Sequence, residues 1–226
     1  QFSRDGQHFV CGGGGRGLVV FDAASHTVSG ESPVPSEVTS LVLCPAQNLL
    51  VTGHEDGKIQ LWDFPALRPR ETLVAHQDEV RNLALHPDGE SLASASADGT
   101  LRLWSITLKR EWGVLDRTDR QYRYWDVAFS NDGQQLYAGR RGAPGLAVFS
   151  LSAKEQEHHR TESIDWEYAI LPFATESKLA DAGYDFSVDA NDSLLVSDYE
   201  LHQVDVDNRR LMNVVSPRGQ PWPLIS

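Results

Sequence analysis

Two tryptophans, Trp62 and Trp104, end closely similar motifs that lie 42 residues apart in this chain. In each motif an Asp-Gly pair precedes the last apolar run, and these pairs, at Asp56 and Asp98, are also 42 residues apart. A fixed offset between matched motifs is the signature of an internal repeat. The chain is therefore expected to fold as a series of similar units, each long enough for about four short strands.

The best-defined unit covers residues 75–105. It contains three alternating apolar runs, at Val80–Leu85, Ser91–Ser96 and Thr100–Ser105. The turn strings His86-Pro87-Asp88-Gly89 and Ala97-Asp98-Gly99 separate them. Period-two alternation broken by Pro-Asp-Gly and Asp-Gly predicts antiparallel strands joined by tight hairpins. A strand meander repeated every ~40–45 residues predicts a β-propeller, an all-β fold of four-stranded antiparallel blades.

The repeats resemble those of the WD-repeat family. The resemblance rests on Trp62-Asp63, Asp56-Gly57, Asp98-Gly99, Trp104 and an Ala75-His76 pair where the family usually has Gly-His. It implies blades arranged around a central channel. It also implies a non-catalytic scaffold that binds other proteins at the rim of that channel.

Five blades are expected over residues 1–226. Their approximate ranges are 1–30, 36–75, 78–116, 122–172 and 181–216. The period lengthens between the fourth and fifth blades, which predicts an irregular insertion at 152–183, and loops this long are often functional. The fifth blade is closer in style to NHL-type propeller repeats than to WD repeats.

Two arrangements of these blades remain open. In the favoured one, the chain is part of a larger, incomplete ring, because it lacks an initiator methionine and its tail is rich in proline. In the other, five blades close a ring, and Trp222–Ser226 supplies the strand missing before Ser3.

The net charge of −12 argues against a general binder of nucleic acid or anionic membranes, which depends on Lys and Arg to neutralise phosphates. It fits protein partners with neutral or basic surfaces. No apolar run approaches the ~18 residues of a transmembrane helix. Cys11 and Cys44 match no metal or redox spacing, so two reduced thiols in a cytoplasmic protein are expected.

The resemblance implies a hydrogen-bonded set inside each complete blade, which stabilises the blade. In the third blade the set is His76, Ser94, Asp98 and Trp104. The second blade keeps Thr52, Asp56 and Trp62 but has Val34 in place of the histidine. The physical reason for such a set is that an indole N–H only donates, a carboxylate only accepts, and an imidazole can bridge the two.

Chemical roles for these residues are weaker alternatives. His76 and Asp98 could form an acid–base pair, but blade stabilisation explains their spacing and no nucleophile accompanies them. The glycine run at 12–15 lacks the Gly-Lys-Ser/Thr that a phosphate loop needs. The adjacent His158 and His159 do not suit one metal ion. No catalytic, metal or cofactor site is therefore expected.

In the resembling family, partner contacts often lie beside the histidine and just before the turn aspartate. The corresponding expected partner-binding face consists of Glu55, Gln77, Glu79, Ala97, Arg123, Arg140 and Arg141. Arg140 and Arg141 are expected in an enlarged, solvated turn of the fourth blade.

Two other functions stay open on the sequence. The chain could be a sensor module of a bacterial multidomain signalling protein such as a kinase, because the third repeat is nearly a consensus. It could also be a propeller hydrolase with a metal held by channel carboxylates, for which the candidates are Asp185, Asp189, Asp198 and Glu200. Neither alternative has the specificity of the repeat motif itself.

Overall fold

The computed structural model describes residues 1–13, 15, 17–74, 76–117, 122–141, 146–151, 168–171, 185–188, 194–197, 201–205 and 210–215. These residues form five antiparallel sheets, each a simple meander in which chain neighbours are sheet neighbours. One sheet has three strands and four have four strands. The all-β prediction and the four-stranded blades are confirmed.

The strands of the first three sheets follow one another without crossovers. The first sheet contains β1 (His8–Gly12), β2 (Leu18–Asp22) and β3 (Thr27–Ser32). The second contains β4 (Val38–Cys44), β5 (Leu49–His54), β6 (Lys58–Asp63) and β7 (Arg68–Val74). The third contains β8 (Val80–Leu85), β9 (Ser91–Ser96), β10 (Thr100–Ser105) and β11 (Arg110–Arg117). The three inner strands of the third sheet have the bounds that the alternation predicts.

The fourth and fifth sheets repeat this order. The fourth contains β12 (Arg123–Phe129), β13 (Gln135–Arg141), β14 (Leu146–Ser150) and β15 (Tyr168–Leu171). The fifth contains β16 (Asp185–Val188), β17 (Leu194–Ser197), β18 (Leu201–Asp205) and β19 (Arg210–Val215). Apart from β15, the expected insertion at 152–183 lies outside the described residues, as does the tail from 216 onward.

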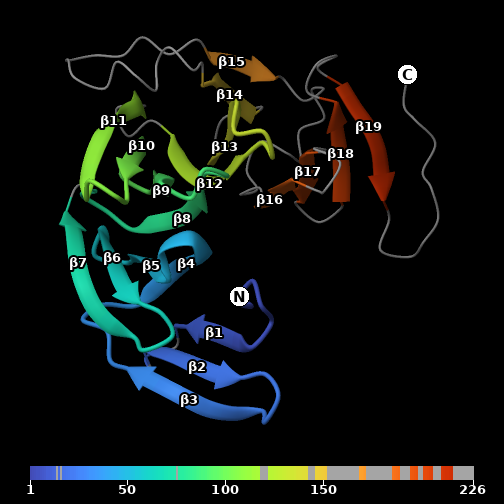
Figure 1. Cartoon of the computed structure of the whole chain (residues 1–226). Coiled ribbons are helices and arrows are strands. Elements are labelled where there is room, and N and C mark those ends of the chain that lie inside the picture. The colour runs from blue at the N-terminus through green and yellow to red at the C-terminus, as the bar shows by residue number, and fades with distance from the viewer. Residues whose placement is uncertain are drawn as a thin grey trace.

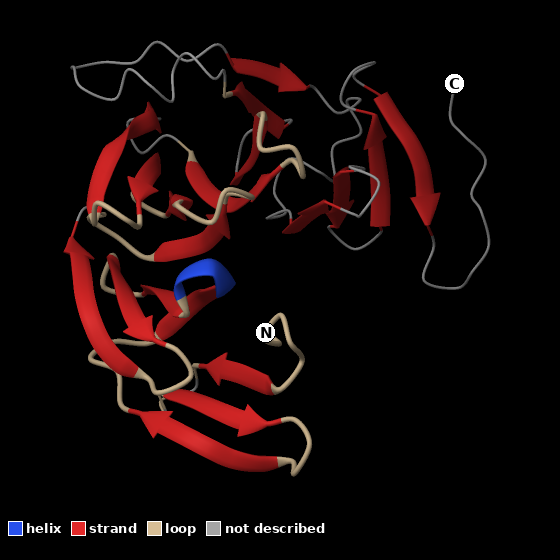
Figure 2. Cartoon of the chain, viewed as in Figure 1, coloured by secondary structure: helices blue, strands red, loops and turns tan. Residues whose placement is uncertain are grey.

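The five sheets stand side by side in an open arc, with the first strand of each full sheet on the inside (Figure 1). Strands β4, β8, β12 and β16 are successive neighbours along this inner side, and β1 lies against β4. The described residues do not close the arc into a ring. The helix among them is one 3-10 turn, Pro45–Gln47, after β4 (blue in Figure 2). No described helix has the length and apolar character needed to cross a membrane.

The first sheet has a remnant of a fourth strand. Phe2 forms an isolated antiparallel bridge to Phe9, and Val10 exchanges backbone hydrogen bonds with Gln1.

The apolar core lies between sheets, where each blade packs on the next. One cluster joins the first and second sheets around Val20 and Trp62, and a second joins the second and third around Leu61 and Trp104. A third cluster joins the third and fourth sheets and includes Phe149. Each large aromatic side chain therefore packs toward the preceding blade. Trp62 and Trp104 have like surroundings, as expected of equivalent positions.

A bulge recurs at one place in three inner strands. The register shifts between Val38 and Ser40 in β4, and at the equivalent points of β8 and β12. A bulge inserts one extra residue and re-aims its side chain. The extra residues, Thr39, Arg81 and Trp125, reach the next blade or receive contact from the previous one, as described below.

Candidate interaction face

Four residues of the third blade form a buried hydrogen-bonded chain. Ser94, on β9, accepts a hydrogen bond from Trp104 Nε1 at 2.8 Å, and its hydroxyl lies 2.6 Å from His76 Nε2. The other imidazole nitrogen, Nδ1, lies 3.2 Å from Asp98 Oδ2. The entry loop, the second strand, the turn and the third strand are thereby tied together.

Asp98 is almost fully engaged by residues of its own turn and of the entry loop. Its carboxylate accepts from the Thr100 hydroxyl at 2.6 Å, from the Thr100 N–H at 2.8 Å and from the Gln77 N–H at 2.9 Å. Burial alone raises the pKa of Asp98, but the hydrogen bonds from His76, Thr100 and Gln77 outweigh it and hold that pKa well below the usual range. The carboxylate therefore stays ionised and has little capacity left for a substrate.

The second blade builds the same arrangement with a different histidine. Trp62 Nε1 donates to the Thr52 hydroxyl at 2.9 Å, as Trp104 does to Ser94. His54 Nε2 lies 2.8 Å from that hydroxyl, and His54 Nδ1 lies 3.0 Å from the Ser36 carbonyl oxygen. Val34 stands at the histidine position of the entry loop, as the sequence indicates, and the imidazole of this blade comes from β5 instead.

Sequence reasoning missed His54 because it searched only the family position. The signal was nonetheless present, since residues two apart on a strand share one face. Thr52 and His54 are such a pair, and both are buried. Asp56 takes a different role from Asp98: it is exposed and pairs with Lys58. It lies outside the buried set to which the sequence assigned it.

The polar side chains buried in these two blades hydrogen-bond to one another and to the backbone, and they do not line a cavity that a substrate could enter. This is the arrangement of a structural network and not of an acid–base pair poised for substrate. In the part of the chain that the structure describes, no three His, Cys, Asp or Glu side chains are placed to hold a metal ion. The side chains proposed for a hydrolase site on the fifth blade lie outside the described residues.

The expected partner-binding residues lie at one end of the blades. There the turn after each second strand meets an entry loop: Glu55 N–H donates to Glu37 O at 3.0 Å, and Ala97 N–H donates to Glu79 O at 2.9 Å. Neighbouring blades also meet here, because a Cβ on Gly57 would lie 2.9 Å from Asp78 O. The second and third blades thus share one continuous edge.

Exposure differs among the residues expected on this face. Glu55, Gln77 and Arg123 are exposed, and Glu79 is half-buried and pairs with Arg81 at 2.7 Å. Ala97 is 5% exposed and is therefore buried at this edge. The guanidinium of Arg81, on the third blade, lies 4.6 Å from the centre of the Trp125 ring, on the fourth.

Arg140 is not a solvated turn residue. It lies within β13, opposite Tyr124, and is 8% exposed. The strand continues through Arg141, whose side chain lies outside the described part. The sequence placed the turn too early because two adjacent arginines read as surface positions, whereas the ladder to β12 extends over both.

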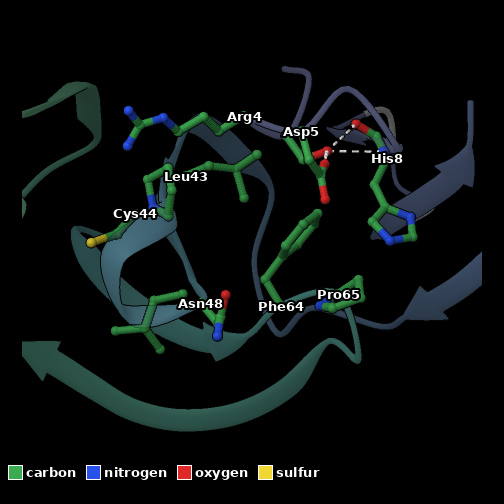
Figure 3. Close-up of a pocket in the computed structure, with 11 residues that line it drawn as sticks. Arg4, Asp5, His8, Leu43, Cys44, Asn48, Phe64 and Pro65 are labelled. Atoms are coloured by element: carbon green, nitrogen blue, oxygen red, sulfur yellow. Dashed lines mark hydrogen bonds between the residues drawn. The ribbon is translucent and has the colours of Figure 1, made fainter.

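The opposite end of the blades holds a pocket of about 380 Å³ between the first and second sheets. Figure 3 shows Asp5 and His8 on one side and Leu43, Cys44 and Asn48 on the other. Asp5 is occupied locally, since it accepts from Ser3 Oγ at 2.6 Å and from Gln7 N–H at 3.0 Å. The Cys44 thiol donates to the Gly89 carbonyl oxygen at 3.0 Å, so its hydrogen-bond acceptor lies within the chain itself.

Four-stranded antiparallel sheets arranged side by side around an arc define a β-propeller, and in the second and third sheets an indole, a hydroxyl and an imidazole form one buried network. The family model described as "WD domain, G-beta repeat" matches residues 25–63 and 67–105. Residues 25–63 and 67–105 are therefore repeats of the WD type.

A curated relative is pre-mRNA-processing factor 19 of Bos taurus, which is 33% identical over 85 residues. The similar segment makes up 36% of this chain and 16% of that protein. The likeness therefore concerns the repeats and not the full length of either chain.

Proposed function

We propose that this chain is a non-catalytic protein-interaction scaffold that docks its partners at the shared edge of the second and third blades. We call the acidic part of that edge the acidic rim and define it as Glu37, Glu55, Asp56, Asp78 and Glu79. The WD-type repeats support a binding role, although a fold alone does not give function. The specific support comes from the charges at this edge.

The observation that carries the proposal is a set of carboxylates on adjacent loops, three of which have no cation partner in the part of the chain that the structure describes. Asp56 pairs with Lys58 and Glu79 with Arg81, but no ion pair reaches Glu37, Glu55 or Asp78 among the described residues. Exposed like charges on neighbouring loops repel one another, and a basic partner relieves this repulsion. Together with the net charge of −12, this favours a partner segment rich in Lys or Arg.

The test is affinity capture of partners with a rim variant. Glu55→Gln, Glu79→Gln and Arg123→Gln are changed together, since these residues lie at the same end of three blades, on a turn, an entry loop and the first position of β12 respectively. A control carries Arg4→Gln and Glu90→Gln, which are exposed at the opposite end. We expect the rim variant to lose the proteins that the unchanged chain retains and the control to keep them, with elution as salt is raised. Unchanged capture by the rim variant would mean that docking takes place elsewhere.

A further inference from the structure

One position of the repeat carries three different polar residues. His54, Ser96 and Arg140 lie near the ends of β5, β9 and β13, opposite Val38, Val80 and Tyr124 in the adjacent inner strands. They are thus equivalent points of the second, third and fourth blades. All three are buried.

In the second and third blades this position is satisfied from within. His54 contacts the Thr52 hydroxyl at 2.8 Å and the Ser36 carbonyl oxygen at 3.0 Å. The Ser96 hydroxyl donates to Asp78 O at 3.1 Å and accepts from the Asp98 N–H at 3.1 Å. Each side chain therefore has partners in its own blade.

The fourth blade lacks these partners. Ala138 stands where the other blades have Thr52 and Ser94, and Phe149 stands in place of the tryptophan. Arg140 Nε is buried without a hydrogen-bond partner. Its guanidinium lies 5.6 Å from the Tyr122 ring, and no carboxylate pairs with it within the described ranges.

A buried guanidinium without an anion is costly, and native proteins almost always pair such a charge. A cation–π contact holds the side chain in place but supplies no acceptor for its N–H groups. The exposed Arg123 lies on the adjacent strand and adds positive charge at the same end. This end of the fourth blade is therefore basic in a chain of net charge −12.

We infer that Arg140 is a binding site for one carboxylate side chain, an aspartate or glutamate of a partner protein. A single planar guanidinium matches a single planar carboxylate through two parallel hydrogen bonds. A doubly charged phosphate would meet stronger repulsion from the acidic rim nearby. The inference rests on the proposed function, because Arg140 lies at the same end of the blades as the acidic rim. The partner would then carry one acidic residue, which binds Arg140, beside the basic segment that binds the rim.

The first test is thermal unfolding of the full chain in sodium acetate and in sodium chloride at equal ionic strength. Acetate is the carboxylate probe, and a ligand that binds only the folded state raises the melting temperature. We expect acetate to stabilise the unchanged chain relative to chloride. We expect Arg140→Met, which keeps the aliphatic stem but not the charge, to melt higher than the unchanged chain in chloride and to lose the acetate effect.

Arg102→Met is the matched control. Arg102 donates to both Glu111 oxygens, at 3.0 and 2.9 Å, so its loss removes a satisfied pair. This variant should melt lower and keep the acetate response. If Arg140→Met melts lower and the acetate response survives, Arg140 is a structural residue and the inference is wrong.

A second readout needs no variant, in case Arg140→Met does not fold. In the unchanged chain, nitrogen-15 NMR follows the arginine Nε resonances during acetate titration. The Arg140 resonance should move and that of Arg102 should not; a stationary Arg140 resonance overturns the inference. Methyl phosphate is the competing probe, and affinity more than tenfold above that of acetate would overturn the carboxylate assignment.

The two proposals fail in different ways. If the rim variant keeps its partners while acetate acts through Arg140, the docking edge is wrong and the carboxylate site remains. If the rim variant loses its partners and Arg140 does not respond, the docking edge remains and the carboxylate site is wrong.

Discussion

A single hydroxyl satisfies two rings in each of the two blades that match the family model. Ser94 serves Trp104 and His76, and Thr52 serves Trp62 and His54. The indole N–H needs this hydroxyl most, since it can only donate a hydrogen bond and is buried away from water in both blades. Losing its acceptor therefore costs more than losing an ordinary hydrogen bond.

Ser94→Ala should lower the free energy of unfolding by about 1–3 kcal/mol, because it leaves the Trp104 N–H buried without an acceptor. Urea denaturation followed by tryptophan fluorescence measures this. Ser150→Ala, at an exposed strand end, is the control and should change little. Equal midpoints for Ser94→Ala and the unchanged chain would show that water replaces the hydroxyl.

His54→Ala and His76→Ala should destabilise the chain by similar amounts, about 1–3 kcal/mol each, because each imidazole contacts a buried hydroxyl through Nε2 and at least one further oxygen through Nδ1. The comparison uses the same denaturation experiment. His26→Ala, at an exposed turn, is the control. A neutral His54→Ala beside a costly His76→Ala would contradict the equivalence of the two histidines.

Because of Asp98, the free energy of unfolding should depend on pH in the acid range. Its pKa is depressed below the ordinary value of 3.8, so its contribution is complete above pH 3.8 and is lost as the pH falls toward the folded value. Asp98→Asn should therefore be less stable than the unchanged chain at neutral pH, and the gap should narrow below pH 3.8. Melting temperatures across the pH range measure this. Asp56→Asn, at an exposed turn, should show a smaller gap throughout.

The sequence predicted some of these buried polar residues and not others. Motif positions located His76, Ser94, Asp98 and Trp104, which the structure places in one network. They could not locate His54, because an imidazole can reach the same hydroxyl from the strand itself. The burial of Arg140 could not be predicted either, because it depends on where β13 ends, and two adjacent arginines suggest a turn rather than a continuing strand.

At the scale of the element, turns fix where blades meet. Gly57 has φ +80°, and a Cβ there would lie 2.6 Å from the His76 carbonyl oxygen of the next blade. Gly6 has a similar φ of +70°, but a Cβ there would meet nothing within 4 Å. The two glycines thus share a left-handed backbone and differ in what surrounds it.

Gly57→Ala should destabilise the chain by more than Gly6→Ala, which should cost only about 1 kcal/mol of left-handed strain. Thermal or urea unfolding of the two variants measures the difference. Because strain is common to both, the excess in Gly57→Ala reports the contact between the second and third blades. If the two variants lost the same free energy of unfolding, the entry loop of the third blade would have moved aside to accommodate the added Cβ at little cost.

Strand positions were predictable where alternation and Asp-Gly turns agree, as in the third blade. The prediction failed at the end of β13, where Arg140 and Arg141 read as a turn. It also could not place β15, because the fourth strand of that sheet comes after a break in the period. The bulges were not predicted either, because each lies near the start of its strand, where too few residues precede it for a shift in the phase of the alternation to be recognised.

At the scale of the whole molecule, the inner strands are linked by polar side chains that follow the bulges. Ser40 accepts from the Leu83 N–H at 3.1 Å, and Asn82 donates to Asp126 on the next blade. Thr39 and Arg81 add further contacts, to Val80 O at 2.5 Å and to the Trp125 ring. In a repeat protein, such contacts between neighbours determine how cooperatively the blades unfold.

Asn82→Ala should uncouple the third and fourth blades, because it leaves the buried Asp126 carboxylate without that donor. We expect a loss of about 1–3 kcal/mol and a shallower urea transition, as blades begin to unfold separately. Gln134→Ala, at an exposed turn, is the control. A transition of unchanged slope and midpoint would show that apolar packing alone couples the blades.

The different origins of the two imidazoles limit how these repeats can be exchanged. A hybrid that joined the entry loop of the second blade to the later strands of the third would combine Val34 with Ser96 and contain neither histidine. The reciprocal hybrid would contain both His76 and His54 and force two rings toward one hydroxyl. Gene-level recombination within these repeats should therefore yield defective blades, even though the segments align without a gap.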